Sequence, residues 1–271
     1  MKRVFSALRA AAVVSTALWA APAFCDLEFN MPVGVTTGSR DIYSLHMLIF
    51  GVCVVIAAGV YGAMIVAIVR FRKSAGAVPA KFSHSTKAEI IWTAIPAVIL
   101  IAMAIPAAET LVRLEDTRNS GLTVKITGYQ WQWNYDYIDY GVSFFSMLDR
   151  ESNFTRQLGS GRDPFQVENY LLEVNERLVV PVDTKVRLLV TSADVLHSWW
   201  MPDFGVKKDA IPGYVNETWF QATETGTFRG QCAELCGMDH GFMPIVVDVV
   251  SREEFDSWLS RKGAATVSAL D

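Results

Sequence analysis

Two long apolar segments near the N-terminus constrain the fold most strongly. Residues 42–69 contain one histidine and no fully charged side chain, and residues 88–112 are apolar apart from one glutamate near each end. About 20 apolar residues cross a bilayer core, so each segment is long enough to span a membrane with some tilt. Pro96 and Pro106 would break a soluble helix, whereas neighbouring helices in a membrane can satisfy the carbonyls that they free. The sequence therefore predicts a two-helix transmembrane hairpin.

The charges around these segments predict the orientation of the hairpin. The connection at residues 70–87 is basic and contains no acid, and short basic loops stay in the cytoplasm. Everything after residue 112 then faces outward, which in a bacterium is the periplasm. Residues 1–23 have the basic start, short apolar run and small-residue cleavage site of a secretory signal peptide, and the run is too short to be a first membrane span.

The rest of the chain has the composition of a soluble, acidic domain. Residues 113–271 carry 15 basic and 23 acidic side chains, a net charge of −8, which argues against a nucleic-acid-binding face. We expect a signal peptide at 1–23, an N-terminal segment with the membrane anchor at 24–112, a periplasmic domain at 113–262 and a C-terminal tail at 263–271. The two spans of the anchor are the apolar segments described above.

Short alternating segments predict that the soluble domain is all-β, a sandwich or barrel. Candidate strands, separated by proline and glycine turns, are residues 123–127, 130–137, 170–174, 185–191, 217–223, 227–231 and 244–250. Residues 252–262 have the pattern of one amphipathic closing helix. Residues 141–169 are polar with weak periodicity, which predicts a loop insertion.

One short segment concentrates metal-binding side chains. Cys232, Cys236, His240 and Met243 fall within twelve residues, and His197 lies 35 residues upstream of the first cysteine. Soft sulfur and imidazole ligands select copper or zinc over hard cations. A ligand loop after one strand, joined by a histidine from a distant strand, is how a β-sandwich builds a copper site.

Two other readings of the cysteines compete with copper. The pair could form a disulfide, because the domain faces an oxidising compartment. A zinc ion is the second alternative, but structural zinc favours four cysteine or histidine ligands, and a thioether is a poor zinc ligand. Copper explains the thioether and both histidines together, so it is the preferred interpretation.

These residues resemble subunit II of the haem–copper cytochrome c oxidases. Residues 230–244 resemble the binuclear copper A loop of that family, and residues 194–199 and 208–213 resemble its flanking strands. The resemblance covers both spans and most of the soluble domain, leaving residues 141–169 and the N-terminus unmatched. It implies a cupredoxin-like sandwich or barrel behind the transmembrane hairpin.

The resemblance also implies a role for each metal-binding side chain. Cys232 and Cys236 would bridge two copper ions, and His197 and His240 would each cap one of them. Met243 would be the weak axial ligand of one copper. Two coppers that share two thiolates spread one electron over both metals, and no ligand position is open for substrate. The resemblance therefore implies a relay of electrons, with the oxygen chemistry in subunit I.

Two glutamates gain roles from the same resemblance. The backbone carbonyl of Glu234 would be the other axial ligand, and its carboxylate would help to bind magnesium at the interface with subunit I, as suits a hard cation. Glu89 matches the residue at the cytoplasmic mouth of a proton channel into subunit I. From position alone, Glu89 could equally be a solvated residue at the end of a span.

The resemblance places the docking site of a redox partner around Trp131. By that match, Trp131 would accept electrons from cytochrome c, although strand alternation would place it on the same, buried face as Trp133. Asp136, Asp139 and Asp194 match acidic positions of the docking patch, and the acidic balance of the domain fits a basic partner. The alternative for each acid is a solvated surface charge.

The expected protein is thus subunit II of a cytochrome c oxidase in a bacterial inner membrane. It would pass electrons from cytochrome c to the haems of subunit I, for oxygen reduction coupled to proton translocation. Its expected partners are subunits I and III, cytochrome c and lipid, with no nucleic acid. Competing interpretations are a quinol oxidase subunit, a membrane-anchored copper storage or assembly module, and the copper domain of a nitrous-oxide reductase.

Overall fold

The structure, a computed structural model, describes residues 29–263 of the chain. The expected signal peptide at 1–23 lies outside the described residues, as does the C-terminal tail from residue 264. The chain divides into two units, Met1–Pro32 and Val33–Asp271. The second unit contains every element described below.

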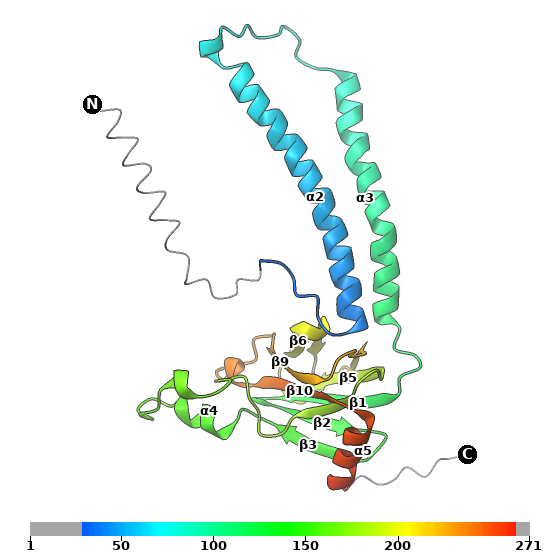
Figure 1. The fold of residues 1–271 in the computed structure, drawn as a ribbon, viewed down its shortest axis with the longest axis vertical. Coiled ribbons are helices and arrows are strands. Elements are labelled where there is room, and N and C mark those ends of the chain that lie inside the picture. The colour runs from blue at the N-terminus through cyan, green and yellow to red at the C-terminus, as the bar shows by residue number, and fades with distance from the viewer. Residues whose placement is uncertain (1–28, 264–271) are drawn as a thin grey trace. The chain divides into compact units, whose positions relative to one another are not determined.

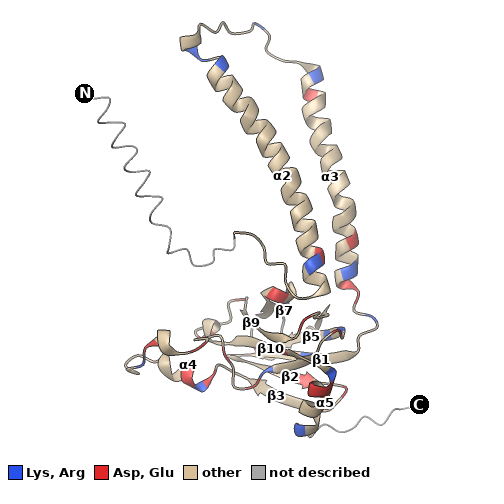
Figure 2. Ribbon diagram, viewed as in Figure 1, with Lys and Arg blue, Asp and Glu red and all other residues tan. Residues whose placement is uncertain are grey.

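Two long helices confirm the transmembrane hairpin (Figure 1). Helix α2 spans Thr37–Arg70 and helix α3 spans Thr86–Glu115, so both extend past the ends of the expected spans. Their most apolar windows have mean hydropathies of 2.7 and 2.3, and no residue in those windows is buried within the chain. Figure 2 shows basic residues where the two helices connect and long uncharged stretches along both. The exposed apolar surface is what a bilayer or a membrane partner would cover.

Polar contacts tie the start of α2 to the β domain. Thr36 and Ser39 form a capping box, in which each side chain accepts a hydrogen bond from the other residue's backbone N–H. The Thr36 hydroxyl also donates to the carbonyl of Phe204, at 2.8 Å, and Thr36 is fully buried. The helix therefore begins at a residue that is itself packed against the β domain.

The part of the chain that follows α3 contains two five-stranded sheets. The strands are β1 (Leu122–Tyr129), β2 (Gln132–Tyr137), β3 (Val142–Ser146), β4 (Leu178–Pro181), β5 (Val186–Ser192), β6 (His197–Met201), β7 (Val206–Ala210), β8 (Asn216–Phe220), β9 (Gly226–Cys232) and β10 (Pro244–Val250). One sheet has the order β3-β2-β1-β5-β8 and the other β4-β10-β9-β6-β7. Most neighbours are antiparallel, but β1 pairs with β5 and β4 with β10 in parallel. This confirms a cupredoxin-like sandwich.

The core between the sheets is strongly aromatic. Trp133, Tyr135 and Tyr137 alternate along β2 and are fully buried, as is Trp199 of β6. Helix α5 (Arg252–Arg261) closes one side of the core, as its amphipathic pattern predicts. The buried stripe on β2 confirms the predicted alternation from residue 132 onward.

The predicted loop insertion at residues 141–169 is wrong in part. It contains β3, the short helix α4 (Arg150–Thr155) and the 3-10 turn η3 (Pro164–Gln166). Conversely, residues 170–174 form turns and a single bridge rather than a strand. Strand β3 is an edge strand that faces solvent at Ser143 and Phe145, so its hydrophobic pattern is weak.

Candidate metal centre

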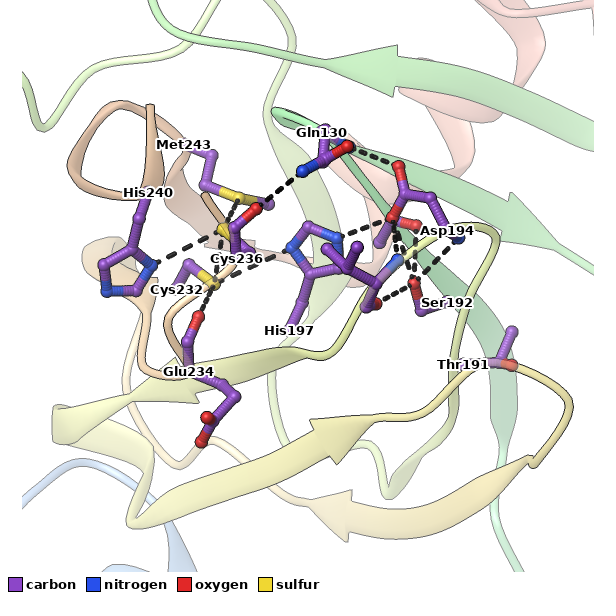
Figure 3. Close-up of polar contacts among 12 residues, drawn as sticks. Gln130, Thr191, Ser192, Asp194, His197, Cys232, Glu234, Cys236, His240 and Met243 are labelled. Carbon is purple, nitrogen blue, oxygen red and sulfur yellow. Dashed lines mark hydrogen bonds and ion pairs between the residues drawn. The ribbon is translucent and has the colours of Figure 1, made fainter. Parts of the chain in front are cut away.

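Strand pairing brings the predicted metal-binding residues together. His197 is the first residue of β6, and Cys232 is the last residue of the neighbouring strand β9. Cys232 stands opposite Trp199 of β6 in the antiparallel register. His197 precedes Trp199 by two residues, so the strand pairing places His197 close to Cys232. The loop from Ala233 to Met243 then folds back over them before β10 begins (Figure 3).

The five side chains converge on two sulfur atoms. The Sγ atoms of Cys232 and Cys236 lie 3.9 Å apart. Nδ1 of His197 lies 3.9 Å from the Cys232 sulfur, and Nδ1 of His240 lies 3.5 Å from the Cys236 sulfur. The Met243 sulfur lies 3.5 Å from that of Cys236. All of these side chains are buried except His240, which is half-buried.

The spacing of the two sulfurs favours a metal over a disulfide. A disulfide bond is about 2.05 Å long, so at 3.9 Å the two residues are thiols. A soft ion placed about 2.3 Å from each thiolate would fit between the two sulfurs. His197, Cys232 and Cys236 place their ligand atoms within 4.8 Å of one another, whereas His240 lies outside this group beside the second sulfur. Each sulfur thus has its own imidazole, an arrangement with ligands for two ions.

The electrostatics of the two thiols differ. Burial opposes ionisation of Cys232, but hydrogen bonding to His197 and to the backbone outweighs it and lowers the pKa of that thiol. Burial, together with the neighbouring Cys232, raises the pKa of the Cys236 thiol to about 12. Two adjacent thiolates repel each other in the absence of a cation. The positive charge of a bound metal ion would offset this repulsion, and a thiol that coordinates the ion is deprotonated.

Residues around the cluster fix the orientation of His197. Its Nε2 lies 2.9 Å from Oδ1 of Asp194, whose other oxygen accepts a hydrogen bond from the backbone N–H of Gln130 at 2.7 Å. The Gln130 side chain donates to the carbonyl of Cys236 at 2.8 Å. A Cβ added to Gly128 would approach the His197 ring to 2.9 Å. The sequence motifs assign no role to Gln130 or Gly128, although both lie within three residues of Trp131.

Trp131 is neither fully exposed nor part of the buried stripe. It precedes β2, its peptide bond with Gln130 is cis, and its ring is half-buried against the core. Its indole Nε1 is buried and has no partner among the described residues. A Cβ added to Gly237 would lie 3.2 Å from the ring. Trp131 therefore lies directly against the loop from Ala233 to Met243 (the cysteine loop), which carries Cys236.

The carbonyl of Glu234 belongs to the cluster, whereas its side chain does not. The carbonyl accepts from the Cys232 thiol at 3.3 Å, and Figure 3 shows the carboxylate pointing away from the sulfurs. The Glu234 side chain is exposed.

The structure does not bring the remaining predicted residues to the cluster. Asp136 stands opposite Lys125 in the hairpin of β1 and β2, and Asp139 accepts from the backbone N–H of Thr123 beyond the far end of β2 from Trp131. Glu89 lies in the first turn of α3, roughly 40 Å of helix away from the end that meets the β domain. Of the three predicted docking acids, only Asp194 contacts the metal-binding residues.

Comparison with known proteins gives consistent matches. The model of the periplasmic domain of cytochrome c oxidase subunit II matches residues 122–250, which include the segment 141–169 that the resemblance left unmatched. The model of the transmembrane domain of the same subunit matches residues 25–109.

Individual relatives carry the same description. A probable cytochrome c oxidase subunit 2 of Rickettsia prowazekii is 40% identical over 84% of this chain and 70% of its own length. Cytochrome c oxidase subunit 2 of Cereibacter sphaeroides is 41% identical over 74% of this chain and 69% of its own length. The crystal structure of the periplasmic domain of subunit II of the Bradyrhizobium japonicum cytochrome oxidase is 44% identical, with a TM-score of 0.46, and covers 54% of this chain and 96% of that domain.

Proposed function

Because the chain belongs to the cytochrome c oxidase subunit II family, with two membrane spans and a periplasmic domain, we propose that it holds a binuclear copper A centre and relays electrons from cytochrome c to subunit I. The observation that carries this proposal is the pair of sulfurs 3.9 Å apart, each with its own imidazole. A storage module would need neither the shared sulfurs nor a tryptophan against the loop.

The contacts in the cluster support a ligand role for each of these residues. Cys232 and Cys236 would bridge two copper ions, with His197 on one ion and His240 on the other. Met243, buried beside the Cys236 sulfur, would be a weak axial ligand, and the Glu234 carbonyl beside the Cys232 sulfur would be the opposite one. When bound, two coppers that share two thiolates supply one-electron transfer with little change in bond length.

The protein framework contributes rigidity and a path to the surface. His197 is anchored on β6, Cys232 at the end of β9 and Met243 just before β10, so the sheet would limit the movement of these three ligands when the charge changes. Trp131 offers a half-buried ring between solvent and the cysteine loop, which suits a residue that accepts electrons from docked cytochrome c. Asp194, Asp136 and Asp139 would contribute to the attraction of a basic partner.

The other predicted roles depend on the assembled oxidase. The exposed Glu234 carboxylate would help to bind magnesium against subunit I, and Glu89 would stand at the cytoplasmic mouth of a proton channel in that subunit. The chain would lie in a bacterial inner membrane with subunits I and III, after removal of a signal peptide at residues 1–23. The proposed domain limits are 24–112 for the anchor and 113–262 for the periplasmic domain; helix α3 extends past the first of these limits, to Glu115.

A substitution with a matched control tests this function. In the purified full-length chain reconstituted with copper, Cys232→Ser should abolish the electron-spin-resonance signal of an electron shared by two coppers. Cys53→Ser removes an exposed thiol of α2, remote from the cluster, and should leave the signal unchanged. An unchanged signal in Cys232→Ser would refute the ligand assignment, and loss of the signal in both variants would point to general misfolding of the chain.

A further inference from the structure

The segment between β3 and β4 is a closed structural unit. At its base, the backbone N–H of Asp149 donates to the carbonyl of Glu173 at 2.9 Å, and the N–H of Met147 donates to the Asn175 side chain at 2.8 Å. Asp149 also caps the N-terminus of α4 with its carboxylate. Ser152 of α4 is fully buried and accepts from the N–H of Leu171. These contacts hold α4 in a defined position at one end of the sandwich.

Arg156, the C-cap residue that follows α4, reaches the loop from Ala233 to Met243. Two guanidinium nitrogens of Arg156 lie 3.2 Å from the two carboxylate oxygens of Asp239, in a bidentate ion pair. The guanidinium carbon lies 4.2 Å from the centre of the Phe242 ring. The third nitrogen, Nε, donates to the Asn153 side chain at 2.8 Å. Arg156 therefore contacts the loop through the side chains of both Asp239 and Phe242.

Asp239 and Phe242 each precede a residue with a proposed role in metal binding. Asp239 comes directly before His240, and Phe242 directly before Met243. The N–H of Phe242 donates to the carbonyl of Asp239 at 2.9 Å, so the two residues share one turn of backbone. A shift of this turn would move the His240 imidazole and the Met243 thioether relative to the Cys236 sulfur.

We propose that Arg156 is a positioning residue for the copper loop, which fixes the His240 and Met243 side of the centre through Asp239 and Phe242. This inference rests on the proposed copper function of the loop. The sandwich itself anchors His197 and Cys232 on strands, whereas His240 lies in the short turn η5 (His240–Phe242), outside any strand. Strand pairing does not hold this half of the site in place. The side-chain contacts of Arg156 supply that support.

The geometry is of the kind that makes an ion pair effective. Most exposed salt bridges contribute little, but the side chains of Arg156 and Asp239 are only 20% and 24% exposed, and their contact is bidentate. The planar guanidinium also faces the aromatic ring, which an ammonium on a flexible stem reproduces poorly. Lysine at position 156 should therefore restore only part of the effect.

The test compares variants of the copper-loaded, full-length chain. Arg156→Gln should alter the hyperfine pattern of the copper signal and speed copper loss to a chelator by about tenfold, in the range typical of residues that support metal ligands. Arg156→Lys should fall between this variant and the parent. Arg162→Gln, which removes an exposed ion-pair partner of Glu151 from the same segment, is the matched control and should behave like the parent.

A second measurement does not depend on copper. In the metal-free chain, Arg156→Gln and Asp239→Asn should each increase amide hydrogen exchange at residues 239–243, and the double variant should exceed neither single variant. Unchanged spectra and exchange in Arg156→Gln, or fully additive effects in the double variant, would overturn the proposal. If the parent binds no pair of coppers but the exchange result holds, the proposed function fails while the mechanical role of Arg156 stands.

Discussion

Oδ1 of Asp194 lies 2.9 Å from Nε2 of His197, on the opposite side of the imidazole from the Cys232 sulfur. This contact would fix which ring nitrogen faces a bound metal, because a carboxylate that accepts from one nitrogen leaves the other free to coordinate. Asp194 was predicted as a docking residue for cytochrome c. The structure adds a contact with a metal-binding residue, so a substitution at Asp194 should affect the centre itself.

Asp194→Asn keeps the shape of the side chain and removes its charge. With one negative charge less beside the centre, the reduction potential should rise by roughly 50 mV, while copper remains bound. Redox titration of the copper-loaded chain measures this shift. Asp139→Asn is the control, because Asp139 contacts the backbone of Thr123 instead of the cluster. Equal shifts in the two variants would contradict a specific role for Asp194.

Gly128→Ala should perturb the site by crowding. The new methyl group would meet the His197 ring at 2.9 Å, and the ring is held in place by Asp194 and Cys232. We expect a loss of about 1–3 kcal/mol in the free energy of unfolding and a changed copper spectrum. Gly241→Ala lies in the same region with open space around the new methyl group, and its spectrum should stay unchanged. Equal effects of Gly128→Ala and Gly241→Ala on the copper spectrum would contradict this prediction.

Trp131→Phe should slow electron transfer from reduced cytochrome c and leave the copper spectrum intact. The smaller ring withdraws from the cysteine loop, and electron transfer weakens steeply with distance. Rapid-mixing absorbance of the assembled oxidase gives the rate. Trp219→Phe is a close control, because Trp219 lies on β8, is also half-buried and has an indole N–H with no partner within residues 29–263. A rate unchanged in Trp131→Phe would remove this residue from the path.

The ion-pair group around Glu173 predicts a pH dependence of stability. Burial opposes ionisation of Glu173, but hydrogen bonds from Arg229 and Arg177 outweigh it and lower the pKa of the carboxyl group. A lowered native pKa stabilises the fold above the unfolded value, near 4.3, and this stability is lost as the pH falls through the native pKa.

Glu173→Gln should therefore lower the melting temperature at pH 7 by roughly 5 °C. The difference from the parent should shrink as the pH falls from about 5 toward 3. Glu151→Gln removes a more exposed carboxylate, 3.8 Å from Arg162, and should change little at any pH. If the melting temperature of Glu173→Gln stays below that of the parent by the same amount down to pH 3, loss of the charge is not the cause of the difference.

The sequence predicts the parts of this molecule that rest on local patterns. The spans follow from uninterrupted apolar runs, and Pro244–Val250 is a strand with the predicted bounds because its residues are buried on both faces. The metal-binding side chains are identifiable because thiols, imidazoles and a thioether rarely cluster by chance. His197 joins them only through pairing between β6 and β9, which the resemblance supplied and local periodicity could not.

The remaining differences come from tertiary contacts. Alternation extended the buried stripe back to Trp131, but β2 begins at Gln132 and the tryptophan packs against the cysteine loop instead. Residues 141–169 lack a clear pattern because β3 is an edge strand and α4 has only six residues. The contact between Arg156 and Asp239 joins positions 83 residues apart, so no local signal marks it.

The central claim is that two coppers share one pair of thiolates, and a metal count with electron spin resonance on the purified full-length chain tests it most directly. After reconstitution with excess copper and removal of loosely bound metal, the account predicts two copper ions per chain and a signal from one electron spread equally over both nuclei. A single copper per chain, or a signal localised on one nucleus, would contradict it.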